Sequence, residues 1–275
     1  MNLSNLSKPN FPGGEVNVQV DAILPEYTIR ADIRSSDDIM RLLMATDALR
    51  RTGMVEKIKL VMPYVPYARQ DRCMVHGDSL SIKVFCDLIN AQKYDSVHIW
   101  DPHSDVTTAL LNNCRVLTQD RIVAANWGAI ANSKEGTVLV CPDAGARKKI
   151  SALLRGLWVN KVIYADKTRQ VSTGKITETT LGQLPEGFKG TEDFVIVDDI
   201  CDGGYTFTQL AKLLRPVTTG KVKLYVTHGI FSKGLDVFSV DEASKIDEVY
   251  TANPWMTFPP SDTQLTILPV DHITY

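Results

Sequence analysis

"FVIVDDICDGGYTF" (194–207) joins an apolar run to a turn of acids and glycines, and then to the start of a helical pattern. The run 194–197 is rich in β-branched residues, which predicts a strand, and 204–215 has the pattern of a helix. Glycines at a helix start expose backbone N–H groups, which bind phosphate with the help of the helix dipole. Three carboxylates beside such a turn exceed what capping needs, so we expect them to face sugar hydroxyls or a magnesium ion.

The same alternation of short β-branched runs and longer amphipathic segments extends along the chain. Predicted strands cover residues 57–63, 96–100, 137–141, 160–165, 194–197 and 221–227. Predicted helices cover residues 35–53, 79–92, 144–156 and 204–215, the first of them capped by Ser35 or Ser36. Strands that alternate with helices predict parallel sheets with crossover helices, which is an α/β fold.

A polar stretch, "NSKEG" (132–136), interrupts this alternation, and the pattern restarts after it. We therefore predict two α/β domains, residues 1–132 and 133–275, with the last residues as candidates for a return to the first domain. In the second domain, residues 167–190 are rich in threonine and glycine and weakly periodic. This composition predicts a mobile loop that leads into a hairpin.

The composition is that of an ordinary globular protein, with a formal net charge of −2. Bulk charge therefore indicates neither a nucleic acid nor a membrane surface as partner. The 5 cysteines are widely spaced and form no CxxC pair, which argues against a disulfide framework or a zinc site. The N-terminal residues lack the apolar core of a signal peptide, and we expect a cytoplasmic protein.

Four predicted strands end in unusually polar segments. These segments are "PYVPYARQDR" (63–72), "DPHSD" (101–105), "PDAGARKK" (142–149) and "DDICDGGYT" (198–206). A single charged turn is most often only a solvated loop. Because ligands of open α/β sheets bind beyond the carboxyl ends of the strands, four such segments predict a shared site.

Two groups of residues in these segments favour polyphosphate chemistry. Asp101 and Asp143 offer the oxygen ligands that Mg²⁺ prefers, and His103 lies two positions after Asp101. Lys167 and Arg169, at the start of the predicted mobile loop, are candidates to close over a polyphosphate and neutralise its developing charge. No Walker A motif occurs in the sequence.

The order of the motifs resembles the class I ribose-phosphate diphosphokinases, the phosphoribosyl pyrophosphate (PRPP) synthetases. The resemblance rests on the four polar segments, on "VTHGIFSKG" (226–234) and on "NFPGGE" (10–15), and it covers nearly the whole chain. It implies two phosphoribosyltransferase-type domains, each a mainly parallel sheet flanked by helices, with ATP on the first and the ribose phosphate on the second. It further implies a homo-oligomer that uses Mg²⁺ to transfer the β,γ-diphosphoryl group of ATP to the anomeric hydroxyl of ribose 5-phosphate, giving PRPP and AMP.

The resemblance also implies a role for individual residues. The residues assigned to ATP are Phe11, Glu15, Arg69, Gln70, Asp143, Ala144 and Gly145. Asp101, His103 and Asp143 would organise the metal and the diphosphate, and Lys167, Arg169 and His103 would be catalytic. Asp198 and Asp199 would hold the ribose hydroxyls, and the 5-phosphate loop would consist of Asp202, Gly203, Gly204, Tyr205 and Thr206.

The 5-phosphate loop departs from the family's usual pattern, Asp-Thr-x-Gly-Thr. Here Gly203 removes one hydroxyl and Tyr205 replaces a glycine. A loop with fewer hydroxyls and a stacking aromatic suits an acceptor with a larger group on the ribose, such as ADP-ribose. Phage-type relatives of the family that rebuild NAD use ADP-ribose, so the same reaction on ADP-ribose, giving ADP-ribose pyrophosphate for NAD salvage, is the alternative.

Two further classes remain open. A non-catalytic regulatory paralogue of the family is one, although the candidate catalytic residues Lys167, Arg169 and His103 are all present. A phosphoribosyltransferase, which consumes PRPP, is the other. That class needs only one such domain and lacks the "PYARQD" and "DPH" elements.

Overall fold

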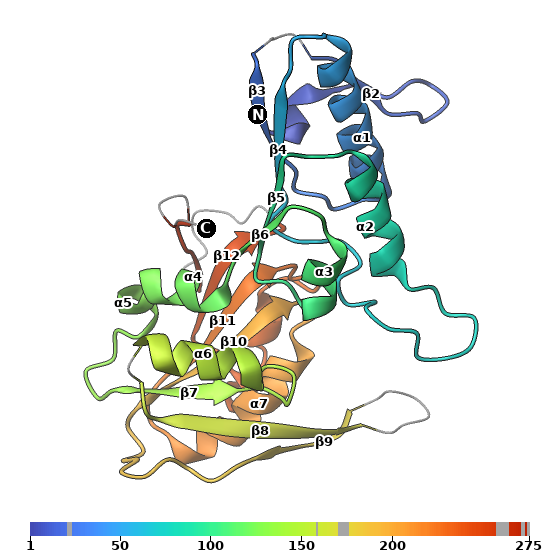
Figure 1. Cartoon of the computed structure of the whole chain (residues 1–275). Helices are drawn as coiled ribbons and strands as arrows, with labels where there is room; N and C mark the ends of the chain where they lie inside the picture. Colours follow the sequence, from blue (N-terminus) through green and yellow to red (C-terminus); the bar gives the residue numbers. More distant parts are fainter. Residues whose placement is uncertain (21–23, 158, 170–175, 257–263, 271–272, 274–275) are drawn as a thin grey trace. The chain divides into compact units, whose positions relative to one another are not determined.

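The computed structural model describes residues 1–20, 24–157, 159–169, 176–256, 264–270 and 273. They form two compact units, Met1–Thr118 (the first unit) and Gln119–Ile273 (the second unit). Both units combine parallel strands with helices, which confirms the predicted α/β class (Figure 1). Among the described residues, no helix has the length and apolar character needed to cross a bilayer.

The sheet of the first unit is parallel, in the order β3-β4-β5-β6. Its strands are Glu26–Arg30 (β3), Lys57–Val61 (β4), Ser96–Trp100 (β5) and Cys114–Leu117 (β6). The helices of the unit are Ser36–Arg51 (α1), Ser81–Ala91 (α2) and Asp105–Leu110 (α3), with a 3₁₀ turn at Leu3–Leu6 (η1). A short antiparallel pair, Ser7–Lys8 (β1) and Asn17–Val18 (β2), precedes the sheet. The predicted strands at 57–63 and 96–100 are thus confirmed.

Helix α1 begins where the sequence predicts. The Ser35 side chain accepts a hydrogen bond from the backbone N–H of Asp38 at 3.2 Å, so Ser35 is the N-terminal cap. Gly53, just after the last turn, has a φ of +71°, which suits a residue that follows a helix. Leu42 and Leu49 on the inner face of α1 pack with Leu60 of β4 in the core of the first unit.

The sheet of the second unit has the order β13-β12-β11-β10-β7-β8-β9, and only the β8–β9 pair is antiparallel among its described strands. Its strands are Thr137–Cys141 (β7), Val162–Arg169 (β8), Ile176–Leu181 (β9), Asp193–Cys201 (β10), Val222–Gly229 (β11), Glu248–Pro254 (β12) and Leu265–Ile267 (β13). Its α-helices are Gln119–Ala125 (α4), Trp127–Ile130 (α5), Arg147–Leu157 (α6) and Tyr205–Leu214 (α7). Short 3₁₀ turns occupy Arg215–Val217 (η2), Asp236–Phe238 (η3) and Glu242–Ser244 (η4).

The central strands of this sheet are buried on both faces. Every residue of β11 is buried, as expected for a parallel strand covered on two sides. Phe207 and Leu210 of α7 pack in one core with Ile196 of β10. Figure 1 shows α6 across the sheet with α4 beside it, and these two helices pack against each other.

The boundary between the units differs from the predicted one. The chain divides after Thr118, so residues 119–132 join the second unit rather than the first. The reason is packing, because α4 lies against α6 and the amide of Asn126 donates to the carbonyl oxygen of Pro269 at 3.1 Å. The polar stretch 132–136 that marked the predicted boundary is an ordinary loop before β7. The predicted return of the last residues falls largely on 271–272 and 274–275, outside the described residues.

Candidate functional site

The polar edge of the first unit's sheet begins at Asp101, which directly follows β5. This residue is only 2% exposed, and its φ of +35° is uncommon for a residue other than glycine. Its backbone N–H donates to the carbonyl oxygen of Leu117, at the end of the neighbouring strand β6, at 2.8 Å. Such backbone conformations persist where surrounding structure enforces them, and they cluster at functional sites. Asp101 is thus held rigidly at the strand end.

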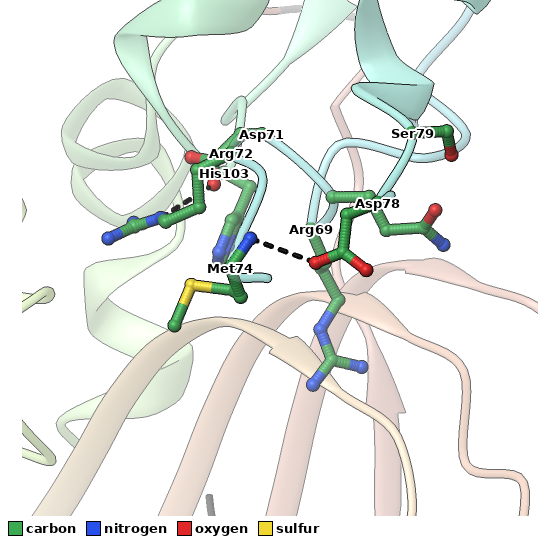
Figure 2. A pocket seen from close by; sticks show the side chains of 8 residues that line it. Arg69, Asp71, Arg72, Met74, Asp78, Ser79 and His103 are labelled. Carbon is green, nitrogen blue, oxygen red and sulfur yellow. Dashed lines mark hydrogen bonds and ion pairs between the residues drawn. The ribbon is translucent and has the colours of Figure 1, made fainter. Parts of the chain in front are cut away.

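A pocket of about 390 Å³ lies at the loops of the first unit. Its lining residues are Arg69, Gln70, Asp71, Arg72, Met74, Asp78, Ser79 and His103. Figure 2 shows Arg69, Asp78 and Ser79 on one side and Asp71, Arg72 and His103 on the other. The structure therefore brings together three of the predicted residues, Arg69, Gln70 and His103. Two arginines and a histidine give the pocket donors suited to a phosphate chain.

Two carboxylates shape the loop around this pocket. The Asp78 carboxylate accepts hydrogen bonds from the backbone N–H groups of Met74 and Val75, both at 2.9 Å. The Asp71 side chain is 6% exposed and accepts from Arg72 Nε at 3.1 Å. Burial alone would raise the pKa of Asp71, but the nearby Ser104 hydroxyl and the hydrogen bond and charge of Arg72 outweigh it and lower that pKa. Asp71 is therefore ionised and offsets part of the pocket's positive charge.

Phe11 and Glu15 lie on a separate turn of the first unit, between β1 and β2. The turn is closed by hydrogen bonds from the N–H of Phe11 to Glu15 O at 2.9 Å and from the N–H of Gly14 to Phe11 O at 2.8 Å. Phe11 is 53% exposed, and neither residue lines the pocket. Figure 1 shows this turn and the loop before α2 well apart within the unit. The structure thus does not bring the predicted adenine contacts Phe11 and Glu15 to Arg69 and Gln70.

The two adjacent acids of the second unit lie on strand β10. The sequence places the end of this strand at residue 197, but β10 continues to Cys201, so Asp198 pairs with Val226 of β11. The Asp199 carboxylate is 3.1 Å from Lys149 Nζ, and the Asp199 N–H donates to Asp198 Oδ1 at 2.9 Å. The ion pair with Lys149 and the hydrogen bond to Asp198 offset part of the unfavourable free energy of placing two carboxylates on a central strand.

The ionisation of Asp198 is strongly affected by its surroundings. Burial raises the pKa of Asp198 well above the ordinary value, and the nearby carboxylates of Asp199 and Asp143 raise it further. Asp143 follows β7, the parallel neighbour of β10, so it lies at the same edge of the sheet as the pair. A carboxyl group whose charge is disfavoured is well suited to hydrogen bonding with a neutral hydroxyl.

The loop that contains Asp143 leads into helix α6. Asp143 Oδ1 accepts from the backbone N–H of Ala146 at 3.2 Å, and a Cβ at Gly145 would approach the same oxygen to 3.3 Å. Basic residues 147–149 form the first turn of α6, where the helix dipole would favour acids. Cations at this end of a helix make a strongly anion-attracting element, consistent with the predicted diphosphate loop 143–145.

The candidate 5-phosphate loop, residues 202–206, connects β10 to α7. Gly204 caps α7 with a φ of +77°, and a Cβ there would lie 2.9 Å from Phe238 Cε1, so only glycine fits. Asp202 Oδ1 accepts from Ser232 Oγ at 2.5 Å, which ties the loop to the segment after β11. Tyr205, the first residue of the helix, is 63% exposed.

Two buried cysteines, Cys141 and Cys201, lie at the ends of β7 and β10. Burial raises the pKa of Cys141 to about 12 and also raises that of Cys201. Neither thiol is ionised at neutral pH, so a thiolate nucleophile is excluded at these two positions.

Lys167 and Arg169 lie on β8 rather than at the start of an irregular loop. The strand pairs antiparallel with β9, matching Lys167 to Thr179 and Arg169 to Ile176. The predicted hairpin is therefore present, and its first strand includes both basic residues. Residues 170–175, which the sequence assigns to the mobile loop, lie outside the described residues.

The predicted metal ligands are divided between the units, with Asp101 and His103 in the first and Asp143 in the second. No cluster of three metal-ligating side chains occurs within the described residues. Mg²⁺ commonly takes one or two carboxylates and fills its remaining positions with water and phosphate oxygens. Asp101 and Asp143 are the right ligand type for that mode of binding.

Several residues of the two sites are not among those predicted. In the first unit these are Asp71, Arg72, Met74, Asp78 and Ser79. In the second unit the missed residue is Lys149, the partner of Asp199. The charges of "RQDR" (69–72) signal the first group, because they continue the predicted polar segment. Nothing local in the sequence signals the pairing of Lys149 with Asp199.

Comparison with known proteins finds a matching protein domain for each of the two units. Residues 1–92 match the N-terminal domain of ribose phosphate pyrophosphokinase, and residues 109–254 match the phosphoribosyl transferase domain. The chain is 30% identical over 264 residues to the ribose-phosphate pyrophosphokinase of Thermococcus kodakarensis, covering 94% of this chain and 88% of that protein. It is 32% identical over 265 residues to the enzyme of the same name from Mycoplasmopsis pulmonis, covering 92% of this chain and 77% of that protein.

A solved structure gives the same fold. The phosphoribosylpyrophosphate synthetase of Mycobacterium smegmatis superposes with a TM-score of 0.73 at 23% identity, covering 95% of this chain and 85% of that chain. The order of the motifs, the two mainly parallel sheets and these matches all agree, and the chain belongs to the ribose-phosphate pyrophosphokinase family.

Proposed function

We propose that this protein is an ATP-dependent diphosphotransferase that converts ribose 5-phosphate and ATP to PRPP and AMP. Membership of the ribose-phosphate pyrophosphokinase family supports the reaction. The observation that carries the acceptor side is the Asp198–Asp199 pair at the end of β10, followed by the Gly203–Gly204 turn that opens α7. Carboxylates for hydroxyls and a glycine turn for a phosphate are the two elements that a ribose phosphate needs.

The first unit supplies the ATP side of the proposal. Arg69, Arg72 and His103 line one pocket, and donors of this kind bind phosphate oxygens strongly. Gln70 adds an amide that can hydrogen bond to a base or a sugar. Phe11 and Glu15 lie on another turn of the same unit, so their contact with adenine remains a prediction from the family resemblance.

The transfer itself needs alignment and charge neutralisation more than covalent catalysis. The anomeric oxygen of the ribose bonds to the β-phosphorus, while the bond from that phosphorus to the oxygen bridging to the α-phosphate breaks and AMP leaves. The anomeric hydroxyl gives up its proton in the same process. Lys167 and Arg169 are the proposed cations that balance the charge developing on the phosphates.

Mg²⁺ is the proposed cofactor, held by Asp101, Asp143 and His103, and it would neutralise the polyphosphate. The buried and rigidly held Asp101 fits a residue that presents carboxylate oxygens to such an ion. Assembly into a homo-oligomer also remains a prediction, and light scattering on the purified protein measures it.

Product analysis tests the proposed reaction directly. The protein is incubated with MgATP and ribose 5-phosphate, and the products are identified by mass spectrometry. We expect AMP and PRPP in equal amounts, and no AMP when ribose 5-phosphate is omitted. Formation of ADP instead of AMP would contradict diphosphoryl transfer. No reaction with any ribose phosphate would favour the regulatory paralogue.

ADP-ribose is a second candidate acceptor because of one specific observation. Tyr205 is 63% exposed at the first position of α7, next to the candidate 5-phosphate loop. An exposed aromatic ring at that place can stack on an extended group carried by the ribose. With this acceptor the same transfer would give ADP-ribose pyrophosphate, a compound suited to NAD salvage.

A direct competition separates the two acceptors. Equal concentrations of ribose 5-phosphate and ADP-ribose are offered with limiting ATP, and both products are measured. Tyr205→Ala should lower the use of ADP-ribose and leave ribose 5-phosphate unaffected if the ring stacks on the larger acceptor. Efficient PRPP formation with no ADP-ribose product would remove the second candidate.

A further inference from the structure

The candidate 5-phosphate loop lacks a basic residue of its own. Residues 202–206 carry one acid, two glycines, a tyrosine and a threonine. A phosphate monoester brings a charge of about −1.5 to −2 at neutral pH, and Asp202 repels it. Backbone N–H groups and the dipole of α7 offset only part of that repulsion. A cation from elsewhere would therefore strengthen the binding of a phosphate at this loop.

A second loop lies against the first and contains such a cation. Residues 230–234 follow β11, and the N–H of Ile230 donates to Cys201 O at 2.8 Å. Ser232 contacts Asp202 twice, through its hydroxyl at 2.5 Å and through its N–H to the carbonyl oxygen of Asp202 at 3.2 Å. These bonds hold the two loops together as one structural element. Lys233 is the next residue.

The Lys233 side chain lies directly against Gly203. Its Cγ is 3.5 Å from the place that a Cβ would take at Gly203, which is ordinary van der Waals contact. A Cβ at this position would still fit beside the lysine stem, so the stem runs along the loop at contact distance. From Cγ, the remaining flexible bonds allow the ammonium group to extend over the loop.

Other described cations at this edge are already engaged. Lys149 pairs with Asp199 at 3.1 Å, and Arg147 pairs with Asp166 at 2.7 Å. Lys233, in contrast, is exposed and makes no ion pair within the described part of the chain. Its charge is available to a ligand.

We propose that Lys233 binds the phosphate carried on C5 of the acceptor and is a specificity-determining residue of this enzyme. The inference rests on the proposed function and assigns to that site a residue from a neighbouring loop. The ammonium supplies the positive charge that the loop 202–206 lacks, and the contact of the lysine stem with Gly203 places it beside that loop. The preferred acceptor is therefore a ribose with an anionic group at C5.

Steady-state kinetics of Lys233→Met tests this role. We expect the KM for ribose 5-phosphate to rise about tenfold or more, because a charge-assisted hydrogen bond is lost. The kcat and the KM for ATP should stay within about twofold of the unaltered enzyme. Lys233→Arg should recover most of the lost affinity, since it keeps the charge. Lys212→Met, on the exposed side of α7, is the matched control and should change nothing.

Calorimetric titration with ribose 5-phosphate, in the presence of a non-hydrolysable ATP analogue, separates two kinds of failure. If the unaltered protein binds ribose 5-phosphate and Lys233→Met binds it equally well, the role of Lys233 is wrong and the proposed function stands. An equal rise of both KM values in Lys233→Met would also overturn the role, because it indicates a general disturbance. If the unaltered protein neither binds nor converts ribose 5-phosphate, the proposed function fails and this inference fails with it.

Discussion

Each of the two units of this chain has a sheet of mainly parallel strands with polar loops at one edge, but the side chains that these loops contribute differ. In both, polar loops follow the carboxyl ends of parallel strands. The first unit gathers two arginines and a histidine, Arg69, Arg72 and His103, around its pocket, together with Asp71 and Asp78. The second gathers acids, and the carboxylates of Asp199 and Asp143 lie close enough to Asp198 to add to the rise in its pKa that burial causes.

This difference shows that the sheet provides the place for ligands while the loops decide which ligand binds. Cationic side chains bind a phosphate chain, whereas carboxylates bind hydroxyl groups and repel phosphate. In the second unit, the proposed binding groups for the phosphate of the acceptor are therefore separate from the acids, namely a glycine turn and a lysine from another loop. Substitutions in the first unit should accordingly change the KM for ATP, and substitutions in the second unit should change the KM for ribose 5-phosphate.

The largest effect is expected for Lys167→Ala. If Lys167 neutralises charge in the transition state, kcat should fall by about 10³-fold, the lower end of what such cations contribute in phosphoryl transfer. The thermal midpoint should stay unchanged, because the residue is near the end of a two-stranded hairpin. Initial rates and thermal unfolding measure both quantities. Lys212→Ala is the control for loss of a surface charge, and unchanged turnover in Lys167→Ala would exclude a catalytic role for this residue.

Gly204→Ala should have the next largest effect. A Cβ at this position combines a left-handed backbone with a 2.9 Å approach to Phe238, so we expect a loss of about 1–3 kcal/mol in the free energy of unfolding. The KM for ribose 5-phosphate should rise as well, while the KM for ATP stays constant. Denaturant unfolding and kinetics measure these changes.

Gly203→Ala is the matched control for that substitution. Gly203 has no left-handed φ, and its nearest neighbour is the flexible stem of Lys233 at 3.5 Å. Gly203→Ala should therefore lower the free energy of unfolding by less than about 1 kcal/mol. Equal destabilisation by both alanines would contradict the special role of Gly204.

The corresponding test in the first unit is Asp78→Ala. This change removes the acceptor of two backbone hydrogen bonds that shape the pocket loop, so the KM for ATP should rise about tenfold. The KM for ribose 5-phosphate should not change. Asp87→Ala, which removes an exposed acid on α2, is the control. If Asp78→Ala altered the KM for the acceptor equally, the assignment of one substrate to each unit would be wrong.

Much of the fold follows from local pattern, and the exceptions have physical reasons. Helix α1 and strands β4, β5 and β7 occur where periodicity and capping predict them. Strand β10 is longer than predicted because Asp198 and Asp199 have the polarity of a turn. Their place on the strand depends on pairing with β11 and on Lys149, which is distant in sequence. Local propensity contains no information on such partners.

The same reasoning applies to the sites. The polar strand ends predicted Asp101, His103 and the acids of β10, because a short sequence motif contains each of them. The pocket in the first unit depends on how the loop 71–79 folds back on itself through Asp78. The contact of Lys233 with Gly203 joins two loops from different strands. Both follow from tertiary structure, which a motif does not specify.

The smallest effect is expected for Asp198→Asn, as a pH-dependent change in thermal stability measured in metal-free buffer. An unfolded aspartate has a pKa near 4, and burial together with Asp199 and Asp143 raises the pKa of Asp198 in the folded protein. The native state therefore holds this proton more tightly than the unfolded chain, and it loses stability as the pH rises from the unfolded value towards the folded one. Asparagine keeps the oxygen that accepts from Asp199 N and carries no charge.

The variant should consequently unfold at a temperature a few degrees higher than the unaltered protein at pH 7. This advantage should shrink to nothing near pH 3, where the carboxyl group is protonated in both states. Thermal unfolding across that pH range measures the difference, and the exposed Asp236→Asn serves as the control in the same unit. A pH-independent difference would mean that packing rather than charge separates the variants. A lower midpoint for Asp198→Asn than for the unaltered protein at pH 7 would mean that the Asp198 carboxyl group stabilises the fold through its partners. It would contradict the view that this group destabilises the fold and is present for ligand binding.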